Sequence, residues 1–343
     1  MPETIVCPFC PLHCDDIIAR DDGSFVSECE LASEAFQAVN QPAQGRFGGE
    51  SINSAELKTL SERLGFSRRP VVEFGLVSIE QAKRLYELKS RIVFKLRAAD
   101  GTHSQTIERD GIDSATISDI TKHADVVLAV GSFDSTPRLL DRLSSSRAQT
   151  HRVDAISATE IGALRNGESV ESIPPEIWTS RYLAILIGES AFETGAEVAC
   201  AESLHRFVRQ RNGQAIDEQG HCRRAILVRF DPHQNLKTVF RWRGNESVDE
   251  SLVPGMSNRW TTEIRLGSAY ASSQDSVQPA VKLQIGGLDP GSDAAEAYLP
   301  AAAVGVHHRG TTIRGDGSVC LPLSDPASSG LDDPIELLRR VLP

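Results

Sequence analysis

Four cysteines within the first thirty residues are the side chains whose type and spacing indicate chemistry most directly. They follow the pattern Cys7-x2-Cys10-x3-Cys14-x14-Cys29. The short gaps let three thiolates converge from one loop, and a fourth from a separate segment completes the ligands of a [4Fe–4S] cluster, in which each sulfur binds one iron. Zinc takes the same four thiolates, but zinc ribbons usually carry two x2 spacings, so the x3 gap favours iron–sulfur. Zinc and an empty site are the alternatives.

A β-hairpin is expected to position the fourth ligand. Short β-prone runs flank an Asp-Asp-Gly turn at 21–23, which predicts a hairpin over residues 15–29. This hairpin would fold Cys29 back beside the other three cysteines. A short helix over 30–39 and a linker over 40–49 are expected to follow.

The other three of the seven cysteines are scattered through the chain. Cys200 is expected on a helix, Cys320 in an alternating strand as core packing, and Cys222 lies beside His221. Nothing in the sequence brings Cys200 to this pair or positions an acid there, so no cysteine–histidine nucleophile is expected. Clustered cysteines in a chain without an evident signal peptide indicate a metal rather than a disulfide framework.

Composition and charge argue against several classes of protein. Apolar residues make up 40% and charged residues 24% of the 343 residues, as in globular proteins. Thirty-six Lys and Arg against 47 Asp and Glu give a net charge of −11, whereas nucleic-acid binding needs a positive surface. No stretch approaches the roughly 18 uninterrupted apolar residues of a membrane helix. We therefore expect a cytoplasmic protein that contacts neither nucleic acid nor membrane.

Beyond the N-terminal lobe, apolar strands alternate with helices, which predicts an α/β fold with parallel sheets covered on both faces. Ser78 and Gln81 form a capping box at the start of one helix. Strands are expected over 70–75, 91–96, 125–130, 150–155, 182–187, 225–230, 261–266 and 280–285. Helices are expected over 54–64, 78–89, 116–123, 136–145, 197–211, 234–242 and 333–342, with short strands and hairpins in the Gly-rich tail.

Two loops that follow buried strands are candidate ligand sites. They span 131–135 and 188–190. In doubly wound sheets, ligands bind at the carboxyl ends of the strands, but neither loop carries a GxGxxG pattern. Two adjacent pairs have structural interpretations instead. Asp15-Asp16 is expected to cap a turn, and the side chains of His307-His308 are expected to diverge in an extended loop.

The opening segment, from Val6 to Ile17, closely resembles the start of the B subunit of formylmethanofuran dehydrogenase, a family of molybdopterin/tungstopterin oxidoreductases. The resemblance also covers residues 69–72, 124–127, 131, 137–138, 152–154, 297–300, 310–317 and the last helix. It implies a molybdopterin-oxidoreductase-like α/β fold, with domains I–III of formate dehydrogenase and DMSO reductase but no C-terminal β-barrel domain. The lobes implied are a Cys-rich N-terminal lobe (1–50), an α/β lobe (51–155 plus 265–343) and an inserted, shortened second α/β lobe (156–264).

One departure from the family concerns its catalytic metal. The catalytic subunit resembles this chain but carries a metal-ligating cysteine or selenocysteine in a loop after the second strand. The corresponding segment, 96–103, has no cysteine, and alignment places Ala99 or a neighbour at the ligand position. Alanine cannot coordinate tungsten or molybdenum, and no thiol lies between Cys29 and Cys200. Molybdopterin or tungstopterin is therefore not expected, and no catalytic residue is expected in this chain.

This pattern resembles the B subunit of the formyltransferase/hydrolase complex of aerobic one-carbon metabolism. The resemblance implies a scaffold subunit in tetrahydromethanopterin-linked formaldehyde oxidation, in which formyl passes between tetrahydromethanopterin and a methanofuran-type carrier. The expected partners are the formyltransferase, the amidohydrolase and the C subunit. One alternative is a catalytic formylmethanofuran dehydrogenase subunit with a non-cysteine ligand, for which His103 is the candidate. Another is a free-standing iron–sulfur or zinc protein.

Overall fold

The computed structural model describes residues 3–41, 44–52, 56–95, 114–144, 146–213, 223–244, 261–267 and 280–343. The chain forms two compact units. Unit 1 comprises Met1–Arg97 and Pro232–Pro343, and unit 2 is the intervening Ala98–Asp231. From the sequence, residues 98–155 were expected in the outer lobe and residues 232–264 in the inserted one, whereas in the structure residues 98–155 belong to unit 2 and residues 232–264 to unit 1.

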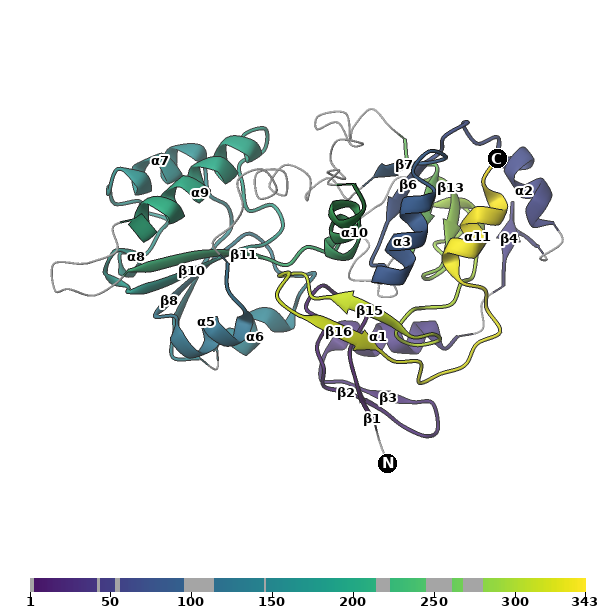
Figure 1. Cartoon of the computed structure of the whole chain (residues 1–343), viewed down its shortest axis with the longest axis horizontal. Helices are drawn as coiled ribbons and strands as arrows, with labels where there is room; N and C mark the ends of the chain where they lie inside the picture. Colours follow the sequence, from purple (N-terminus) through teal and green to yellow (C-terminus); the bar gives the residue numbers. More distant parts are fainter. Residues whose placement is uncertain are drawn as a thin grey trace. The chain divides into compact units, whose positions relative to one another are not determined.

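Unit 2 is built on a four-stranded parallel sheet in the order β11-β10-β8-β9. Every residue of the two central strands is buried, because their continuous apolar runs are covered on both faces. The strands are β8 (Val126–Val130), β9 (Gln149–Val153), β10 (Tyr182–Ile187) and β11 (Arg224–Arg229). The helices are α5 (Ile117–His123), α6 (Arg138–Ser144), α7 (Ala158–Arg165), α8 (Glu176–Thr179) and α9 (Glu197–Gly213). Figure 1 shows α7 and α9 on one side of this sheet and α5 and α6 on the other.

Unit 1 contains a seven-stranded mixed sheet in the order β5-β4-β14-β13-β12-β6-β7. Its five parallel strands are β6 (Val71–Phe74), β7 (Val93–Lys95), β12 (Ile264–Leu266), β13 (Val281–Ile285) and β14 (Ala295–Leu299), and the antiparallel edge is β4 (Arg46–Phe47) and β5 (Glu50–Ser51). Its helices are α2 (Leu57–Leu64), α3 (Ile79–Glu87), α10 (Gln234–Gly244) and α11 (Pro334–Val341). One apolar core joins these helices to the sheet. The linker expected over 40–49 contains β4, and β14 was not among the expected strands.

The N-terminal lobe belongs to unit 1 and matches the predicted hairpin and helix. Its small sheet consists of β1 (Glu3–Ile5), β2 (Ile17–Ala19) and β3 (Phe25–Val26), followed by α1 (Glu30–Val39). Phe36 of α1 stacks on Phe25 with a ring-centroid distance of 4.2 Å and meets Phe9 edge-on at 4.8 Å. These aromatic contacts hold the hairpin and the cysteine loop against the same helix. A two-stranded C-terminal hairpin, β15 (Gly310–Ile313) and β16 (Cys320–Leu323), completes the unit.

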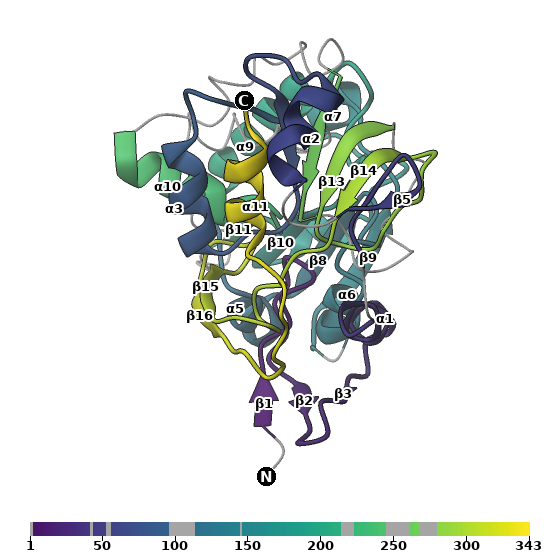
Figure 2. The same cartoon turned by 90° about the vertical axis from the view of Figure 1, so that its right-hand side faces the viewer.

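Both large sheets have the same doubly wound topology. In each, the second strand lies on one side of the first and the third strand on the other: β9-β8-β10-β11 in unit 2 and β7-β6-β12-β13-β14 in unit 1. The switch point of such a sheet lies between its first and third strands, and ligands bind outside the carboxyl ends there. The switch points are therefore between β8 and β10 and between β6 and β12. The seven-stranded sheet is seen from another direction in Figure 2.

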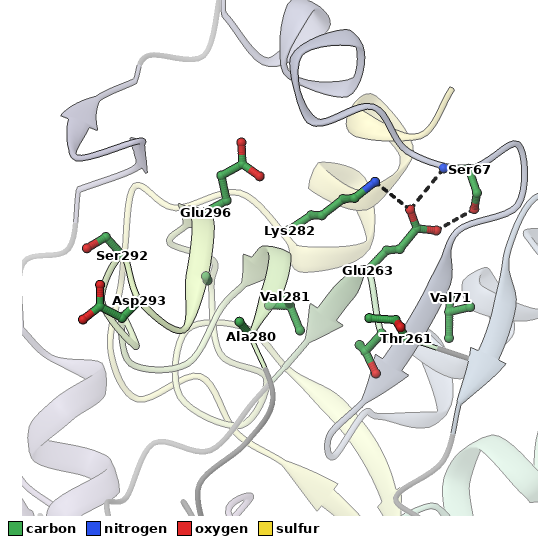
Figure 3. Close-up of a pocket in the computed structure, with 12 residues that line it drawn as sticks. Ser67, Val71, Thr261, Glu263, Ala280, Val281, Lys282, Ser292, Asp293 and Glu296 are labelled. Carbon is green, nitrogen blue, oxygen red and sulfur yellow. Dashed lines mark hydrogen bonds and ion pairs between the residues drawn. The ribbon is translucent and has the colours of Figure 1, made fainter. Parts of the chain in front are cut away.

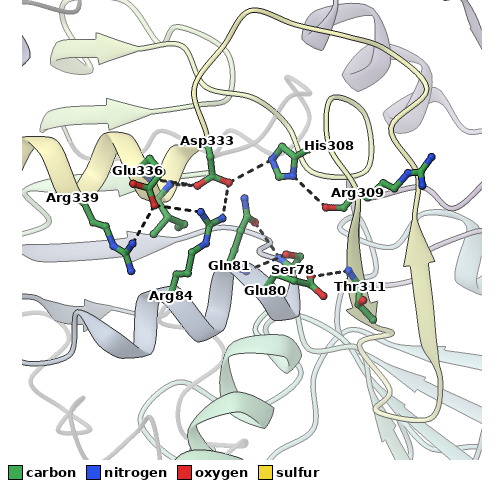
Figure 4. Close-up of polar contacts among 11 residues, drawn as sticks. Ser78, Glu80, Gln81, Arg84, His308, Arg309, Thr311, Asp333, Glu336 and Arg339 are labelled. Atoms are coloured by element: carbon green, nitrogen blue, oxygen red, sulfur yellow. Dashed lines mark hydrogen bonds and ion pairs between the residues drawn. The ribbon is translucent and has the colours of Figure 1, made fainter.

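The C-terminal helix α11 is held in place by the polar contacts of a single carboxylate, Asp333 (Figure 4). Asp333 caps the helix by accepting hydrogen bonds from the N–H groups of Ile335 and Glu336 at 2.8 and 3.3 Å. It also accepts one from Arg84 of α3 at 2.7 Å, and His308 Nε2 lies 3.6 Å away. Burial alone would raise the pKa of Asp333, but Arg84 and the helix N–H groups outweigh it and hold this pKa below its ordinary value.

Replacing Asp333 by asparagine is expected to lower the free energy of unfolding by about 1.5 kcal/mol, because a charge-assisted hydrogen bond and a charged cap are lost. A depressed folded-state pKa stabilises the fold above the ordinary aspartate pKa, and this stabilisation is lost as the pH falls through the folded-state value. The variant should therefore lose less stability than the wild type below about pH 4. Urea titrations at several pH values measure this.

Asp332→Asn is the matched control. The Asp332–Arg340 pair has a similar 2.7 Å contact, but both side chains are nearly half exposed, and exposed pairs contribute about 0–1 kcal/mol. Equal effects of the two substitutions at every pH would contradict the role assigned to Asp333.

Candidate functional site

The cysteine loop lies where the sequence predicts it, and all four cysteines are buried. Cys7, Cys10, Cys14 and Cys29 are between 3% and 8% exposed. Two backbone hydrogen bonds close the loop, from Cys7 N to Cys14 O at 2.7 Å and from His13 N to Cys10 O at 3.1 Å. Cys29 stands at the N-cap of α1, directly after the hairpin. The hairpin therefore returns the fourth cysteine to the lobe that holds the other three.

The buried thiols influence one another electrostatically. Burial raises the pKa of Cys7 well above its ordinary value, and the neighbouring cysteines raise it further. Burial and the charges of Cys14 and Cys29 raise the pKa of Cys10 to about 12. Without a cation the Cys7 and Cys10 thiols are neutral near pH 7, whereas a bound metal would stabilise thiolate forms.

The donor set suits iron–sulfur or zinc, but its present arrangement does not. Four thiols within one lobe are the ligands that both metals use. Among the described residues, however, no group of three or more His, Cys, Asp or Glu side chains is arranged to hold a metal ion. Metal binding would therefore require the thiols to turn toward a common centre.

His13 anchors the loop through a buried hydrogen-bond chain that the sequence did not reveal. Its backbone is left-handed, with φ of 45°, a conformation in which histidine is enriched among non-glycine residues. Nδ1 lies 3.0 Å from the Cys7 carbonyl oxygen, and Nε2 lies 2.9 Å from Thr312 Oγ1 of β15. Burial lowers the pKa of His13 to about 4, so the ring is neutral near pH 7.

The proton positions along this chain follow from its chemistry. A carbonyl only accepts, so Nδ1 of His13 carries the proton and Nε2 accepts from the Thr312 hydroxyl. Thr312 Oγ1 then accepts from Asn235 Nδ2 of α10 at 2.8 Å. The same amide donates to Val77 O at 2.8 Å, and its oxygen accepts from Ile313 N at 2.6 Å. These hydrogen bonds therefore tie the cysteine loop to β15, to α10 and to the segment between β6 and α3 in one defined arrangement.

The Gly310–Gly317 segment of the family resemblance lies against this same loop. Gly315 N donates to Pro11 O at 2.8 Å, and a Cβ on Gly305 would lie 2.8 Å from Pro8 Cβ. Arg314 pairs with Asp316, whose side chain is fully buried, at 3.0 Å. Two segments that are about 300 residues apart in the sequence thus form one structural site.

At the switch point of unit 2, both predicted loops come together but close on each other. Ser132 and Glu189 exchange two backbone hydrogen bonds, of 2.8 and 2.7 Å. A Cβ on Gly131 would overlap the Glu189 carbonyl oxygen, and one on Gly188 would overlap that of Ser132. Glycine is therefore required for this approach, and backbone joins backbone at the carboxyl ends of β8 and β10, the place where ligands of doubly wound sheets bind.

The switch point of unit 1 is narrowed in the same way. Gly75 follows β6 and donates its N–H to Leu266 O of β12 at 2.9 Å. A Cβ on Gly75 would overlap the carbonyl oxygen of Gly267, which has a left-handed φ of 60°. Backbone thus meets backbone at the carboxyl ends of β6 and β12.

A pocket of about 540 Å³ lies at the opposite edge of this sheet, at the amino ends of its parallel strands (Figure 3). Its central carboxylate, Glu263, accepts hydrogen bonds from Ser67 N at 3.1 Å, Ser67 Oγ at 2.5 Å and Lys282 Nζ at 3.0 Å. Burial alone would raise the pKa of Glu263, but these hydrogen bonds outweigh it and lower this pKa. The Glu263–Lys282 ion pair links the amino ends of the neighbouring strands β12 and β13. These side chains therefore stabilise the sheet.

The remaining sequence candidates do not form a reactive group among the described residues. Asp15 and Asp16 are exposed. His307 Nδ1 accepts a hydrogen bond from Ala303 N at 3.0 Å, whereas His308 approaches Asp333, so the two side chains diverge as expected.

The predictions for the three scattered cysteines compare differently with the structure. Cys200 is buried on α9, as predicted. Cys320 is exposed, so its assignment to core packing was wrong; it lies on a two-stranded hairpin that leaves the side chain in solvent. Cys222 and His221, and the segment 96–103 with Ala99 and His103, lie outside the described residues.

Comparisons with known proteins were informative at the level of structure. No family model matches the sequence, and no curated protein matches it. A chain in the X-ray structure of the formyltransferase/hydrolase complex (FhcABCD) from Methylorubrum extorquens, in complex with methylofuran, matches with a TM-score of 0.60. The two chains are 15% identical, over 87% of this chain and 97% of that chain. This chain shares its fold.

The likeness to the FhcABCD chain covers almost all of that chain. The mixed α/β fold expected from the sequence is therefore confirmed. No helix among the described residues has the length and apolar character needed to cross a membrane.

Proposed function

We propose that this chain is a non-catalytic component of a formyltransferase/hydrolase complex, equivalent to its B subunit. The observation that carries the proposal is the fold shared with a chain of FhcABCD over 87% of this chain and 97% of that chain. The resemblance of residues 6–17 to the B subunit of formylmethanofuran dehydrogenase supports this choice, because it rests on a different property of the chain.

The closed switch points support a structural role within that complex. A cofactor-binding α/β subunit needs an open crevice outside the carboxyl ends at the switch point. The Ser132–Glu189 bridge and the approach of Gly75 to Gly267 place backbone there instead. We infer that neither unit holds a pterin or nucleotide at its switch point. The fold then serves to support partner subunits.

In this role the chain would take part in tetrahydromethanopterin-linked formaldehyde oxidation. Formyl groups would pass between tetrahydromethanopterin and a methanofuran-type carrier on other subunits, and the amidohydrolase subunit would release formate. The partners proposed are the formyltransferase, the amidohydrolase and the C subunit.

Co-expression with these three subunits tests the proposal. A tag on this chain should recover all four polypeptides as one stable complex after size-exclusion chromatography. Migration of the tagged chain as a monomer, with the other subunits assembled without it, would contradict the proposal and favour a free-standing protein.

For the cysteine site we propose a structural [4Fe–4S] cluster, bound when the four thiols turn toward a common centre, with zinc or an empty site as the alternatives. Anaerobically purified protein should be brown and contain about four iron atoms per chain. Cys10→Ser should remove the colour and lower the free energy of unfolding by about 3 kcal/mol or more, since the binding energy of a structural metal is folding energy. Elemental analysis and thermal melting measure both effects.

Cys320→Ser is the matched control, because this cysteine is exposed on β16. It should leave the colour and the melting temperature unchanged. A colourless protein with one zinc would show that the site binds zinc and that the proposed iron–sulfur cluster is wrong. A metal-free protein whose melting temperature Cys10→Ser does not change would show that the loop folds without metal.

A further inference from the structure

The negative charge of the chain is concentrated in its N-terminal lobe. Residues 3–34 contain eight Asp and Glu and a single basic residue, Arg20, and His13 is neutral. This segment therefore has a net charge of −7, against −11 for all 343 residues. Less than a tenth of the chain holds more than half of its net charge, so the rest of the molecule is close to neutral for its size.

The outer face of the small β1–β3 sheet presents an apolar stripe. Thr4, Ile18 and Val26 are cross-strand partners in consecutive pairs. All three are exposed, and Ile18 and Val26 are 40% and 37% exposed. On the opposite face, Ile5 and Ile17 are almost completely buried. Side chains on a strand alternate between faces, so the inner set fills the lobe and the outer set remains partly open to solvent within the described chain.

Acidic residues frame this stripe at both ends. Asp16 and Glu28 lie two residues from Ile18 and Val26, and the antiparallel register places them at the same end of the stripe. Asp21 and Asp22 occupy the turn at the other end, beside Arg20, and all four acids are exposed. In Figures 1 and 2 the three strands extend away from the large sheet of unit 1.

We propose that the outer face of β1–β3 is the docking surface for a partner subunit that presents lysines and arginines around an apolar centre. This inference rests on the proposed function. An interface of this kind has an apolar core and a polar rim, and opposite potentials across it steer association. Ile18 and Val26 supply the centre, and the four acids supply the rim.

The charge of this face disfavours other occupants. Phosphates of nucleic acids and anionic lipids are repelled by a face that is rimmed by four acids and carries a single arginine. A second copy of this chain would bring two such surfaces together. Pairing of a strand at the sheet edge is also disfavoured, because β3 has only two residues and short edge strands resist it.

The test uses the full chain co-expressed with the formyltransferase, amidohydrolase and C subunits, with the tag on a partner subunit. Ile18→Lys/Val26→Lys should reduce the recovered chain about tenfold or more, because two buried contacts would become buried cations. The isolated variant should still melt cooperatively and within a few degrees of the wild type, since both side chains are partly exposed and lie between the acids of the rim. Recovery of the wild-type chain should fall as salt rises from about 0.05 to about 0.5 M.

Val198→Lys is the matched control, because Val198 is 43% exposed on α9 of unit 2. Its recovery should equal that of the wild type. Equal recovery of the wild type, Val198→Lys and the double variant would show that the outer face of β1–β3 is not the docking surface. The proposed function would still stand in that case. If the wild-type chain itself is not recovered, the proposed function is overturned, and this partner with it.

Discussion

Asn235→Ala is expected to lower the free energy of unfolding of unit 1 by about 3 kcal/mol. The side chain is 3% exposed and makes three hydrogen bonds, to Val77 O, Thr312 Oγ1 and Ile313 N. Truncation leaves a buried carbonyl and a buried N–H without their partner, and it removes the donor that fixes the Thr312 hydroxyl toward His13. Hydrogen exchange of unit 1 peptides in increasing urea measures the loss.

Asn40→Ala is the control for this prediction. Asn40 is exposed and its amide makes one long hydrogen bond, 3.4 Å to Gly23 O, so its loss should cost less than about 0.5 kcal/mol. Combining Asn235→Ala with Thr312→Val should cost less than the sum of the single changes, because the two side chains share one hydrogen-bond chain. Strictly additive losses of stability would show that Asn235 and Thr312 do not act through one shared set of hydrogen bonds.

Gly188→Ala is expected to lower the free energy of unfolding of unit 2 by about 3 kcal/mol. The new Cβ would overlap the Ser132 carbonyl oxygen, which belongs to the backbone and cannot turn aside. The two loops must separate, and the pair of hydrogen bonds between Ser132 and Glu189 is lost. Faster hydrogen exchange at Ser132 and Glu189 would show the opening directly.

Gly162→Ala in α7 is the contrasting change in the same unit. A Cβ there would meet nothing within 4 Å, so the substitution should stabilise unit 2 by about 0.5–1 kcal/mol through helix propensity. Equal stabilities of the Gly188→Ala and Gly162→Ala variants would contradict the closed switch point.

Local elements were predictable because their signals are local. The helix over 30–39 follows from its amphipathic pattern, and Ser78 with Gln81 makes both hydrogen bonds of the predicted capping box. The apolar runs at 126–130 and 182–187 are buried strands, as their composition indicates. The strand over 295–299 was missed because its alanines have low strand propensity. The segment forms a strand because it is buried within the sheet.

The partition of strands between the two sheets was not predictable in the same way. β8 and β9 follow β7 in the chain, and consecutive strands usually share a sheet. Here β8 pairs with β10, and β9 pairs with β8. No residue near 97 or 231 signals that a new unit begins or ends. The larger lobe was therefore expected to include residues 98–155.

The candidate site also combines features that nearby residues predict with contacts between distant residues that they do not. The four cysteines and both switch-point loops were identified because their residue types and their places after strands can be read locally. The chain from His13 to Thr312 and Asn235 was not identified, because its members are 299 and 77 residues apart along the sequence. Likewise, the Gly131 and Gly188 loops could be placed at strand ends, but their mutual closure depends on the distance between two backbones.

Elemental analysis of the four-subunit complex, purified anaerobically through a tag on this chain, tests the central claim most directly. We expect a complex that contains this chain stoichiometrically and hydrolyses formyl groups, with tungsten and molybdenum far below one atom per complex. Tungsten or molybdenum at one atom per chain, together with dye-coupled oxidation of formylmethanofuran, would contradict it and identify the chain as a catalytic subunit with a non-cysteine ligand.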